Sequence, residues 1–405
     1  MHSFASIATV ALGLSLAQYA LAAPSAYPSG QSGQCPQGRP AKALYFQTNM
    51  PTGNSVVAVP ILPNGGLDVK RYSTHATGGC GSAGMEAMNA TAGPDALFSQ
   101  DAVIVQDHML FATNAGSNTF TMFKIDRRNP TCLTMVGEPA ATMGEFPVAV
   151  AYSKHLKTAC VLNSGAADGV ACYSVSGRTG LKALDTGARK LNLGQSTPPL
   201  GPTGTVSDIF FTPDSKMLIV MVKGNPPTKV AGFVAVYPVV NGTVSMTPVK
   251  SNPVGSVALF GSSIISNTEI LATDAGFGTM KLKIDPVTHV VTADVKTTIA
   301  GQAATCWSAY SPKTGSVYVT DIKMNRIEEI SAASGKIVSA LNFTNGNTGN
   351  IDDIVGGDFL YSLSPSLGKT DIAVVSLACG QGKMKELETF SIPGANQFSS
   401  GLAVL

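Results

Sequence analysis

The stretch Leu110-Phe-Ala-Thr-Asn-Ala-Gly-Ser-Asn-Thr-Phe-Thr-Met-Phe-Lys-Ile-Asp126 decides the fold of this chain. A short β-prone run ends in a polar residue, turns through Gly and Ser, and re-enters a run that alternates apolar with polar residues. Seven such units follow one another at intervals of roughly 43 to 65 residues, and their first runs end near Asn49, Asn114, Asn163, Lys223, Asp274, Asp321 and Ser364. Each unit is typical of one four-stranded propeller blade. We therefore predict an all-β, seven-bladed β-propeller.

A further short run precedes each strand pair and is predicted to be the innermost strand of its blade. These runs are residues 102–106, 148–152, 208–212, 257–260, 306–310 and 351–355. The first blade has no such run before it, because the preceding segment is polar. The missing strand appears at the other end of the chain, as residues 401–405. We predict that this C-terminal strand joins the first blade and closes the ring, which removes an exposed sheet edge.

The N-terminal residues predict an exported protein. An apolar run at residues 7–16 precedes Ala20-Leu21-Ala22, with small residues at the positions that a signal peptidase reads. We predict a signal peptide at 1–22, a flexible Pro- and Gly-rich leader at 23–40 and a single propeller domain at 41–405. No later apolar stretch approaches the 18 or so residues that span a bilayer. The expected location is secreted, either extracellular or associated with the cell wall.

Composition argues against a nucleic-acid partner. Only 13% of the residues are charged and the net charge is +2, so the sequence has no basic patch for electrostatic steering. Glycine (42) and proline (24) are abundant, as many short strands joined by turns require. We expect a monomer with no membrane span.

Seven cysteines in an exported chain predict up to three disulfides and one free thiol. Cys160 and Cys172 are predicted to pair, because a hairpin sets them opposite each other on neighbouring strands. A Cys35–Cys379 bridge is predicted to tie the chain ends, Cys80 and Cys132 are the remaining pair, and Cys306 is left as a buried small hydrophobe. Three sequons predict glycosylation at Asn89, Asn241 and Asn342.

Propeller geometry gathers particular polar residues at one opening of the central channel, here called the mouth. Innermost strands begin and second strands end on this face. We predict catalytic candidates and substrate-binding candidates among these residues: Glu145, Asp208, Lys223, Asp274 and Asp321 for catalysis, and Asn49, Asn114, Asn163, Asp352 and Asp353 for binding. The alternative is that these carboxylates and amides only cap loop amides around an empty funnel.

Two kinds of chemistry fit an acidic and amide-rich mouth. A carboxylate with a raised pKa could act as general base on water while Lys223 or an amide stabilises the developing oxyanion. Alternatively, the ring of oxygen atoms could hold Ca²⁺, which takes six to eight oxygen ligands and can activate a lactone carbonyl. No ligand cluster is close in sequence, so we predict either no cofactor or Ca²⁺.

Three segments resemble the lactonase-like seven-bladed propellers. The stretch quoted above resembles their strand–turn–strand unit, and Phe211-Thr-Pro-Asp-Ser-Lys-Met-Leu-Ile-Val220 and Ala309-Tyr-Ser-Pro-Lys-Thr-Gly-Ser-Val-Tyr-Val-Thr-Asp321 resemble their inner hairpin. That family is similar in plan to bacterial phosphogluconolactonase and the fungal carboxymuconate-lactonizing enzyme. With its predicted signal peptide and sequons, this chain most resembles the secreted fungal branch described as carboxymuconate cyclase-like. The resemblance implies a small-molecule lactone as substrate.

The chain departs from this family at the mouth. Family members tend to place His or Arg there, often as Pro-x-His, whereas the matching positions read Gln100-Asp101-Ala102, Phe146-Pro147-Val148 and Ser207-Asp208-Ile209. An acidic mouth repels a polyanionic substrate such as a sugar acid or muconate. We predict lactone hydrolysis or lactonization. The alternative is a non-catalytic extracellular glycoprotein, adhesin- or antigen-like, that binds carbohydrate or a surface partner through its loops.

Overall fold

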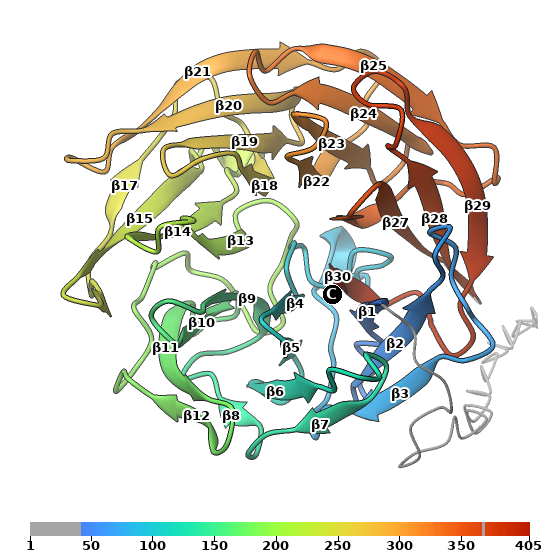
Figure 1. Cartoon of the computed structure of the whole chain (residues 1–405). Helices are drawn as coiled ribbons and strands as arrows, with labels where there is room; N and C mark the ends of the chain where they lie inside the picture. Colours follow the sequence, from blue (N-terminus) through green and yellow to red (C-terminus); the bar gives the residue numbers. More distant parts are fainter. Residues whose placement is uncertain (1–41, 367–368) are drawn as a thin grey trace, which may run out of the picture.

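The computed structural model describes residues 42–366 and 369–405. The predicted signal peptide, the leader and Cys35 lie outside this range. Seven antiparallel sheets surround a central axis, so the predicted all-β, seven-bladed propeller is confirmed (Figure 1). No helix in the described ranges is long and apolar enough to cross a membrane.

From the axis outward, the sheets follow chain order. Blade 1 contains β30 (Ser400–Val404), β1 (Lys42–Gln47), β2 (Ser55–Ile61) and β3 (Ser73–Ala76). Blade 2 contains β4 (Val103–Gln106), β5 (Met109–Asn114), β6 (Thr119–Ile125) and β7 (Leu133–Met135), with β8 (Ala140–Ala141) also paired to β6. Blade 3 contains β9 (Pro147–Ser153), β10 (Thr158–Asn163), β11 (Gly169–Ser176) and β12 (Gly180–Ala183).

The second half of the ring repeats this plan. Blade 4 contains β13 (Val206–Phe211), β14 (Met217–Val222), β15 (Phe233–Val240), β16 (Thr243–Val244) and β17 (Val249–Ser251). Blade 5 contains β18 (Leu259–Ile264), β19 (Glu269–Asp274), β20 (Gly278–Ile284) and β21 (Val291–Thr298). Blades 6 and 7 contain β22 (Thr305–Ser311), β23 (Ser316–Asp321), β24 (Arg326–Ser331), β25 (Ile337–Asn342), β26 (Ile351–Gly356), β27 (Phe359–Ser366), β28 (Lys369–Ser376) and β29 (Lys385–Ser391). Two short 3₁₀ turns, η1 (Ala87–Asn89) and η2 (Pro226–Thr228), lie in loops.

The C-terminal strand closes the ring as predicted. β30 pairs antiparallel with β1, with Leu44 opposite Val404 and Tyr45 opposite Ala403. The first and last strands of the domain therefore share one sheet. β30 therefore covers the inner edge of β1, which would otherwise be unpaired.

The core lies between neighbouring sheets. The second strand of a blade is buried on both faces, as in β14, whose six residues Met-Leu-Ile-Val-Met-Val are all buried. Side chains such as Ile219 of blade 4 pack with Ile270 and Met280 of blade 5. The outer strands alternate instead: in β21 buried or half-buried residues alternate with exposed ones. Burial thus falls from the inner strands to the rim, which matches the sequence pattern.

One innermost strand begins later than the sequence predicts. The run 257–260 was expected to form it in blade 5, whereas β18 spans Leu259–Ile264. The backbone amides of Val257 and Ala258 donate to the Asp274 carboxylate at 2.7 and 3.0 Å, which holds this pair in the loop. A register shift follows between Leu259 and Ser262. Similar β-bulges interrupt β13, β22 and β26 near their starts. Bulges of this kind re-aim side chains and are frequent beside functional sites.

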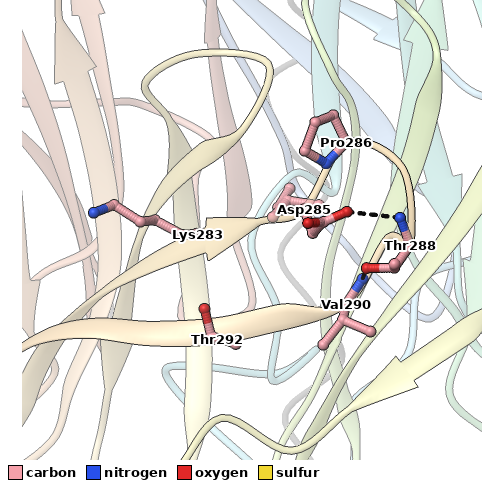
Figure 2. Close-up of a pocket in the computed structure, with 7 residues that line it drawn as sticks. Lys283, Asp285, Pro286, Thr288, Val290 and Thr292 are labelled. Atoms are coloured by element: carbon pink, nitrogen blue, oxygen red, sulfur yellow. Dashed lines mark hydrogen bonds between the residues drawn. The ribbon is translucent and has the colours of Figure 1, made fainter.

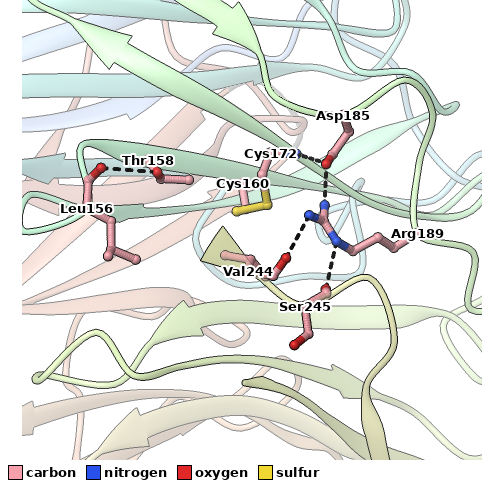
Figure 3. Close-up of a disulfide and its surroundings, with 8 residues drawn as sticks. All are labelled: Leu156, Thr158, Cys160, Cys172, Asp185, Arg189, Val244 and Ser245. Carbon is pink, nitrogen blue, oxygen red and sulfur yellow. Dashed lines mark hydrogen bonds and ion pairs between the residues drawn. A yellow bond between two sulfur atoms is a disulfide. The ribbon is translucent and has the colours of Figure 1, made fainter. Parts of the chain in front are cut away.

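The predicted disulfide between Cys160 and Cys172 is present. The two residues are directly opposite in the pairing of β10 with β11, as expected (Figure 3). Beside the disulfide, the Asp185 carboxylate accepts a hydrogen bond from the Cys172 amide at 2.7 Å and pairs with the Arg189 guanidinium. The latter also donates to the Ser245 carbonyl of blade 4 at 2.9 Å. One buried cation therefore joins blades 3 and 4.

The other two predicted pairings are wrong. Cys80 and Cys379 carry free thiols, whereas Cys132 is disulfide-bonded, so Cys80–Cys132 and Cys35–Cys379 do not form. Cys80 follows β3 on the mouth face, but Cys132 precedes β7 on the opposite face, too far apart to bond. Cys379 is exposed in the turn after β28. Cys306 is free and buried, as predicted.

The three predicted glycosylation asparagines lie on the surface. Asn89, Asn241 and Asn342 are all exposed, and so are the threonines of their sequons. Glycosylation at these positions stays a prediction. The exposure is the condition that an attached glycan requires.

Candidate functional site

Two of the predicted catalytic carboxylates cap loops. The Asp274 carboxylate accepts hydrogen bonds from the Val257, Ala258 and Gly276 amides at 2.7 to 3.0 Å. Asp321 does the same at the corresponding strand end, accepting from the Ala303 and Ala304 amides at 2.7 Å and from the Lys323 amide at 2.8 Å. Both side chains are buried. Their oxygen atoms are engaged by the backbone, so neither is placed to take a proton from water.

The predicted substrate-binding asparagines have the same structural role. Asn49 exchanges hydrogen bonds with the backbone of Ser82, at 2.7 Å to its carbonyl and 3.2 Å from its amide. Asn114 accepts from the Thr77 hydroxyl at 2.7 Å, and Asn163 donates to two backbone carbonyls at 3.2 Å. All three have no exposed surface. They hold loops in place and do not face an open mouth.

Glu145 ties two loops together. Its carboxylate accepts a hydrogen bond from the hydroxyl of Thr197, in the proline-rich loop between blades 3 and 4. The amide of Ala166 donates to the same hydroxyl at 2.8 Å. The half-buried Glu145 therefore positions the loop of residues 193–205 over blade 3.

Asp208 belongs to a different environment, the centre of the mouth. It has no exposed surface, and neither carboxyl oxygen receives a hydrogen bond of good geometry from an N–H or hydroxyl group in the described chain. Its carboxyl group instead faces that of Asp101, at the start of blade 2. Burial raises the pKa of Asp101 to about 7, and burial followed by the Asp101 charge raises the pKa of Asp208 well above its usual range. The pair therefore shares a proton near neutral pH.

Lys223 lies beside this pair. Its side chain is buried, and its Nζ donates to the Phe98 carbonyl at 2.6 Å and to the Val206 carbonyl at 2.7 Å, with the Phe260 ring centre 4.5 Å away. Burial lowers the pKa of Lys223 to about 7, and the nearby Asp95 carboxylate partly opposes this. Burial likewise raises the pKa of Asp95 to about 7. An amine that titrates near neutrality can donate or take a proton.

Asp352 and Asp353 complete the cluster from blade 7. Asp352 accepts from the Gly401 amide at 2.6 Å, and burial raises its pKa well above the usual range, with Asp101 and Asp95 adding to the effect. Burial raises the pKa of Asp353 to about 6, and the Thr320 hydroxyl donates to it. Blades 2, 4 and 7 thus direct titratable groups with shifted pKa values to one place, which is typical of functional sites.

The mouth is closed by the chain itself. Residues 95–101, here called the plug, belong to the long insertion between β3 and β4 that lies over the centre of the ring in Figure 1. The Gln100 amide donates to the Ser207 carbonyl at 2.9 Å, and its side chain bonds to blades 5 and 6 through Ser262 and Ser308 at 3.2 and 3.0 Å. Each plug residue from 95 to 100 is at most 8% exposed. The cluster lies beneath a covered opening.

The sequence predicts only some of the residues in this cluster. Asp208, Lys223, Asp352 and Asp353 were predicted from their places at strand ends, and they do gather at the mouth. Asp101 stands at an innermost strand start like Asp208, so the same signal could have selected it. Asp95 and Phe98 lie in an insertion without periodicity, and nothing in the sequence places them.

A separate surface hollow of about 550 Å³ lies at the turn between β20 and β21 (Figure 2). Asp285 lines it, but its carboxylate accepts from the Val287 and Thr288 amides of its own turn at 2.9 and 2.7 Å. Lys283 pairs with Asp294 at 3.0 Å. The polar groups serve the hairpin, and no reactive set converges there.

The described residues offer no set of ligands for the calcium ion predicted from the sequence. Within residues 42–366 and 369–405, no three His, Cys, Asp or Glu side chains gather in an arrangement that could hold a metal ion. Burial raises the pKa of the cluster's carboxyl groups, and a protonated carboxyl is a poor cation ligand. A bound Ca²⁺ stays a prediction from the sequence alone.

The solved structures that this chain resembles include 6-phosphogluconolactonase-like seven-bladed propellers. The periplasmic gluconolactonase of Pseudomonas aeruginosa is 15% identical, with a TM-score of 0.61 over 90% of this chain and 99% of its own. A Lactobacillus plantarum protein is 14% identical with the same TM-score and coverage. A 6-phosphogluconolactonase-like protein of Bacteroides fragilis is 11% identical, with a TM-score of 0.59 over 90% of this chain and 98% of its own. No family model and no curated protein matches the sequence. At such identities the likeness concerns the fold.

Proposed function

We propose that this protein is an exported lactonase-like propeller that hydrolyses or forms lactones at its channel mouth. One observation carries the proposal: the Asp101–Asp208 carboxyl pair, whose pKa values burial raises, and Lys223, whose pKa burial lowers, converge at the point where innermost strands begin. The gluconolactonase among the structural neighbours supports the same class of substrate. The signal peptide predicted from the sequence and the exposed sequons support export and glycosylation.

The residues have distinct roles in the proposed reaction. The ionised member of the Asp101–Asp208 pair takes a proton from water, and the water oxygen forms a bond to the lactone carbonyl carbon. Lys223 stabilises the oxyanion that develops on the carbonyl oxygen. The ring C–O bond then breaks, the aspartate pair returns the proton taken from water to the ring oxygen, and a hydroxy acid leaves with the base regenerated. Lactonization is the same sequence in reverse.

The charge of the cluster selects the substrate class. Lys223 is the only cationic side chain among these groups, and the remaining members are the carboxyls of Asp95, Asp101, Asp208, Asp352 and Asp353. A phosphorylated sugar acid would add at least one negative charge without a cation to receive it. We therefore propose neutral sugar lactones.

Hydrolysis of a neutral sugar δ-lactone, followed by acid release at constant pH, tests this function. The wild-type chain and Phe98→Ala, which removes the side chain at the centre of the plug, are compared with the same chains carrying Asp208→Asn. We expect catalysis above the buffer rate and its loss by a factor of about 100 or more with Asp208→Asn, since proton transfer contributes that much. Rates equal to buffer in all four proteins would contradict the proposal.

The covered mouth favours a second candidate, a non-catalytic glycoprotein that binds carbohydrate or a surface partner. Its binding face would be formed by the loops on the mouth side, where large apolar side chains are exposed: Met88 is 98%, Leu200 50% and Val254 88% exposed. Inactivity in the assay above together with binding on a glycan array would favour this candidate.

A further inference from the structure

We propose that residues 95–101 are an autoinhibitory plug whose Phe98 carbonyl occupies the position at Lys223 that a lactone carbonyl takes in the reaction. This inference rests on the proposed function and adds its regulation. The plug must move out of the mouth before a substrate can enter.

The Phe98 carbonyl bonds to Lys223 as a substrate carbonyl would. A carbonyl oxygen 2.6 Å from Nζ has the distance and the chemistry of a substrate carbonyl bound for attack. This carbonyl belongs to the main chain, at a residue with φ of +56°. A side chain other than glycine avoids that left-handed region unless its surroundings impose it. The contacts around Phe98 therefore hold the carbonyl against the lysine.

The plug forms hydrogen bonds with several blades. Besides the Gln100 bonds to blades 4, 5 and 6, the Ser99 hydroxyl donates to the Val148 carbonyl of blade 3 at 2.9 Å. The Trp307 indole N–H donates to the Ser99 carbonyl at 3.2 Å. The plug thus bonds to the innermost strands of four blades. It bonds across the opening, and Asp208 beneath it has no exposed surface.

Two glycines pack closely against the Phe98 ring. Gly84 and Gly201 face the ring so closely that an added Cβ would lie 2.4 and 2.6 Å from its atoms. The two glycines belong to different loops, which are joined by backbone bonds of 2.8 Å from Met85 to Pro199 and from Gly201 to Met85. Just outside, residue Met88 is 98% exposed. The exposed segment at Met88 is continuous with the buried Phe98 ring. A ligand or partner that binds this segment would therefore displace the plug.

Cys306 provides a direct measure of plug opening. Its thiol is free and only 6% exposed, and it lies in the same cluster, close enough for Asp95 and Lys223 to influence its pKa. The neighbouring Gly261 is tightly packed between Gln100 and the Cys306 carbonyl. Because the buried thiol lies beside these plug contacts, we expect a thiol reagent to alkylate Cys306 faster once the plug has moved. This readout does not depend on catalysis.

The experiment measures the alkylation rate of Cys306 by mass spectrometry in a background of Cys80→Ser and Cys379→Ser. Phe98→Ala and Gln100→Ala release the plug, and Phe123→Ala, which removes a buried ring in the core between blades 1 and 2, is the matched control. We expect alkylation about tenfold faster or more in both plug variants at temperatures well below unfolding, and no such change in the control. Lactone hydrolysis is measured on the same samples and should rise in parallel.

The outcomes separate the two proposals. Faster alkylation with faster hydrolysis supports both. Fast alkylation of Cys306 in the parent chain itself, or hydrolysis that does not change when alkylation accelerates, overturns the plug and leaves lactone chemistry standing. Accelerated alkylation without hydrolysis in any protein overturns the lactonase function and, with it, the inhibitory role.

Discussion

The carboxyl groups of Asp101 and Asp208 face each other at the channel mouth although they come from blades 2 and 4. Two buried carboxylates at such close range cannot both be ionised without strong repulsion, so one proton is retained between them. The charge of Asp101 adds to the raised pKa of Asp352, and the charge of Asp208 opposes the lowering of the Lys223 pKa by burial.

The stability of the fold should therefore depend on pH in a defined direction. Both carboxyls have a pKa near 4 in the unfolded chain, whereas that of Asp101 is about 7 in the folded chain and that of Asp208 is also raised. Between about pH 4 and 7 the folded state binds more protons, so the free energy of unfolding falls as the pH rises through this window. Asp208→Asn should reduce this slope by up to about 1.4 kcal/mol per pH unit, measured by urea unfolding at several pH values.

The control for this slope is Asp285→Asn. Asp285 caps an exposed turn and its pKa is lowered by the Thr288 and Val287 amides, so its effect belongs to the acidic end of the range. An identical slope in wild type and Asp208→Asn would show that the pair does not retain a proton.

Asp274 should matter for stability and not for proton transfer. Asp274→Ala removes three amide hydrogen bonds from a fully buried carboxylate and leaves the Val257 and Ala258 amides without acceptors. We expect a loss of about 2 to 4 kcal/mol in the free energy of unfolding, since each stranded buried donor costs about 1 to 3 kcal/mol. Chemical denaturation measures this loss, and Asp285→Ala at the exposed turn should lose less. If Asp274→Ala keeps full stability but abolishes lactone hydrolysis, Asp274 is a catalytic residue.

The comparison of Asp208 with Asp274 shows how far the sequence leads. Strand periodicity and the C-terminal run predict seven blades, ring closure and the face on which both residues lie, because each follows from local pattern. The two carboxylates look alike in sequence. Their roles differ because the loop before β18 turns its amides toward Asp274, whereas Asp208 meets Asp101 from another blade. Contacts across the ring, including the plug, are formed by tertiary packing and leave no periodic signal.

Removing one partner of the buried ion pair between Arg189 and Asp185 should strongly destabilise the fold. Both side chains are at most 4% exposed, and Arg189 also donates to two carbonyls of blade 4 (Figure 3). Arg189→Ala leaves an unpaired buried carboxylate, which costs about 3 to 5 kcal/mol. The exposed Arg178→Ala should leave the unfolding midpoint unchanged. The double variant Arg189→Met with Asp185→Leu should recover most of the loss, and a failure to recover would assign the loss to the blade 4 contacts.

Gly401 lies in β30, where the ring closes. Gly401 and Gly301 have nearly the same backbone conformation, with φ of +72° and +70°, but an added Cβ at Gly401 would lie 2.6 Å from the Val103 nitrogen, whereas Gly301 has no atom within 4 Å. Alanine at either position carries the same cost of a left-handed backbone, about 1 kcal/mol. Gly401→Ala must in addition push β30 away from β4 and disturb the bond from its amide to Asp352. We expect Gly401→Ala to lower the free energy of unfolding by about 2 kcal/mol more than Gly301→Ala, because overpacking a rigid core adds that much. Equal losses in urea unfolding would mean that the closing strand adjusts freely, and the ring would then be held by its other contacts.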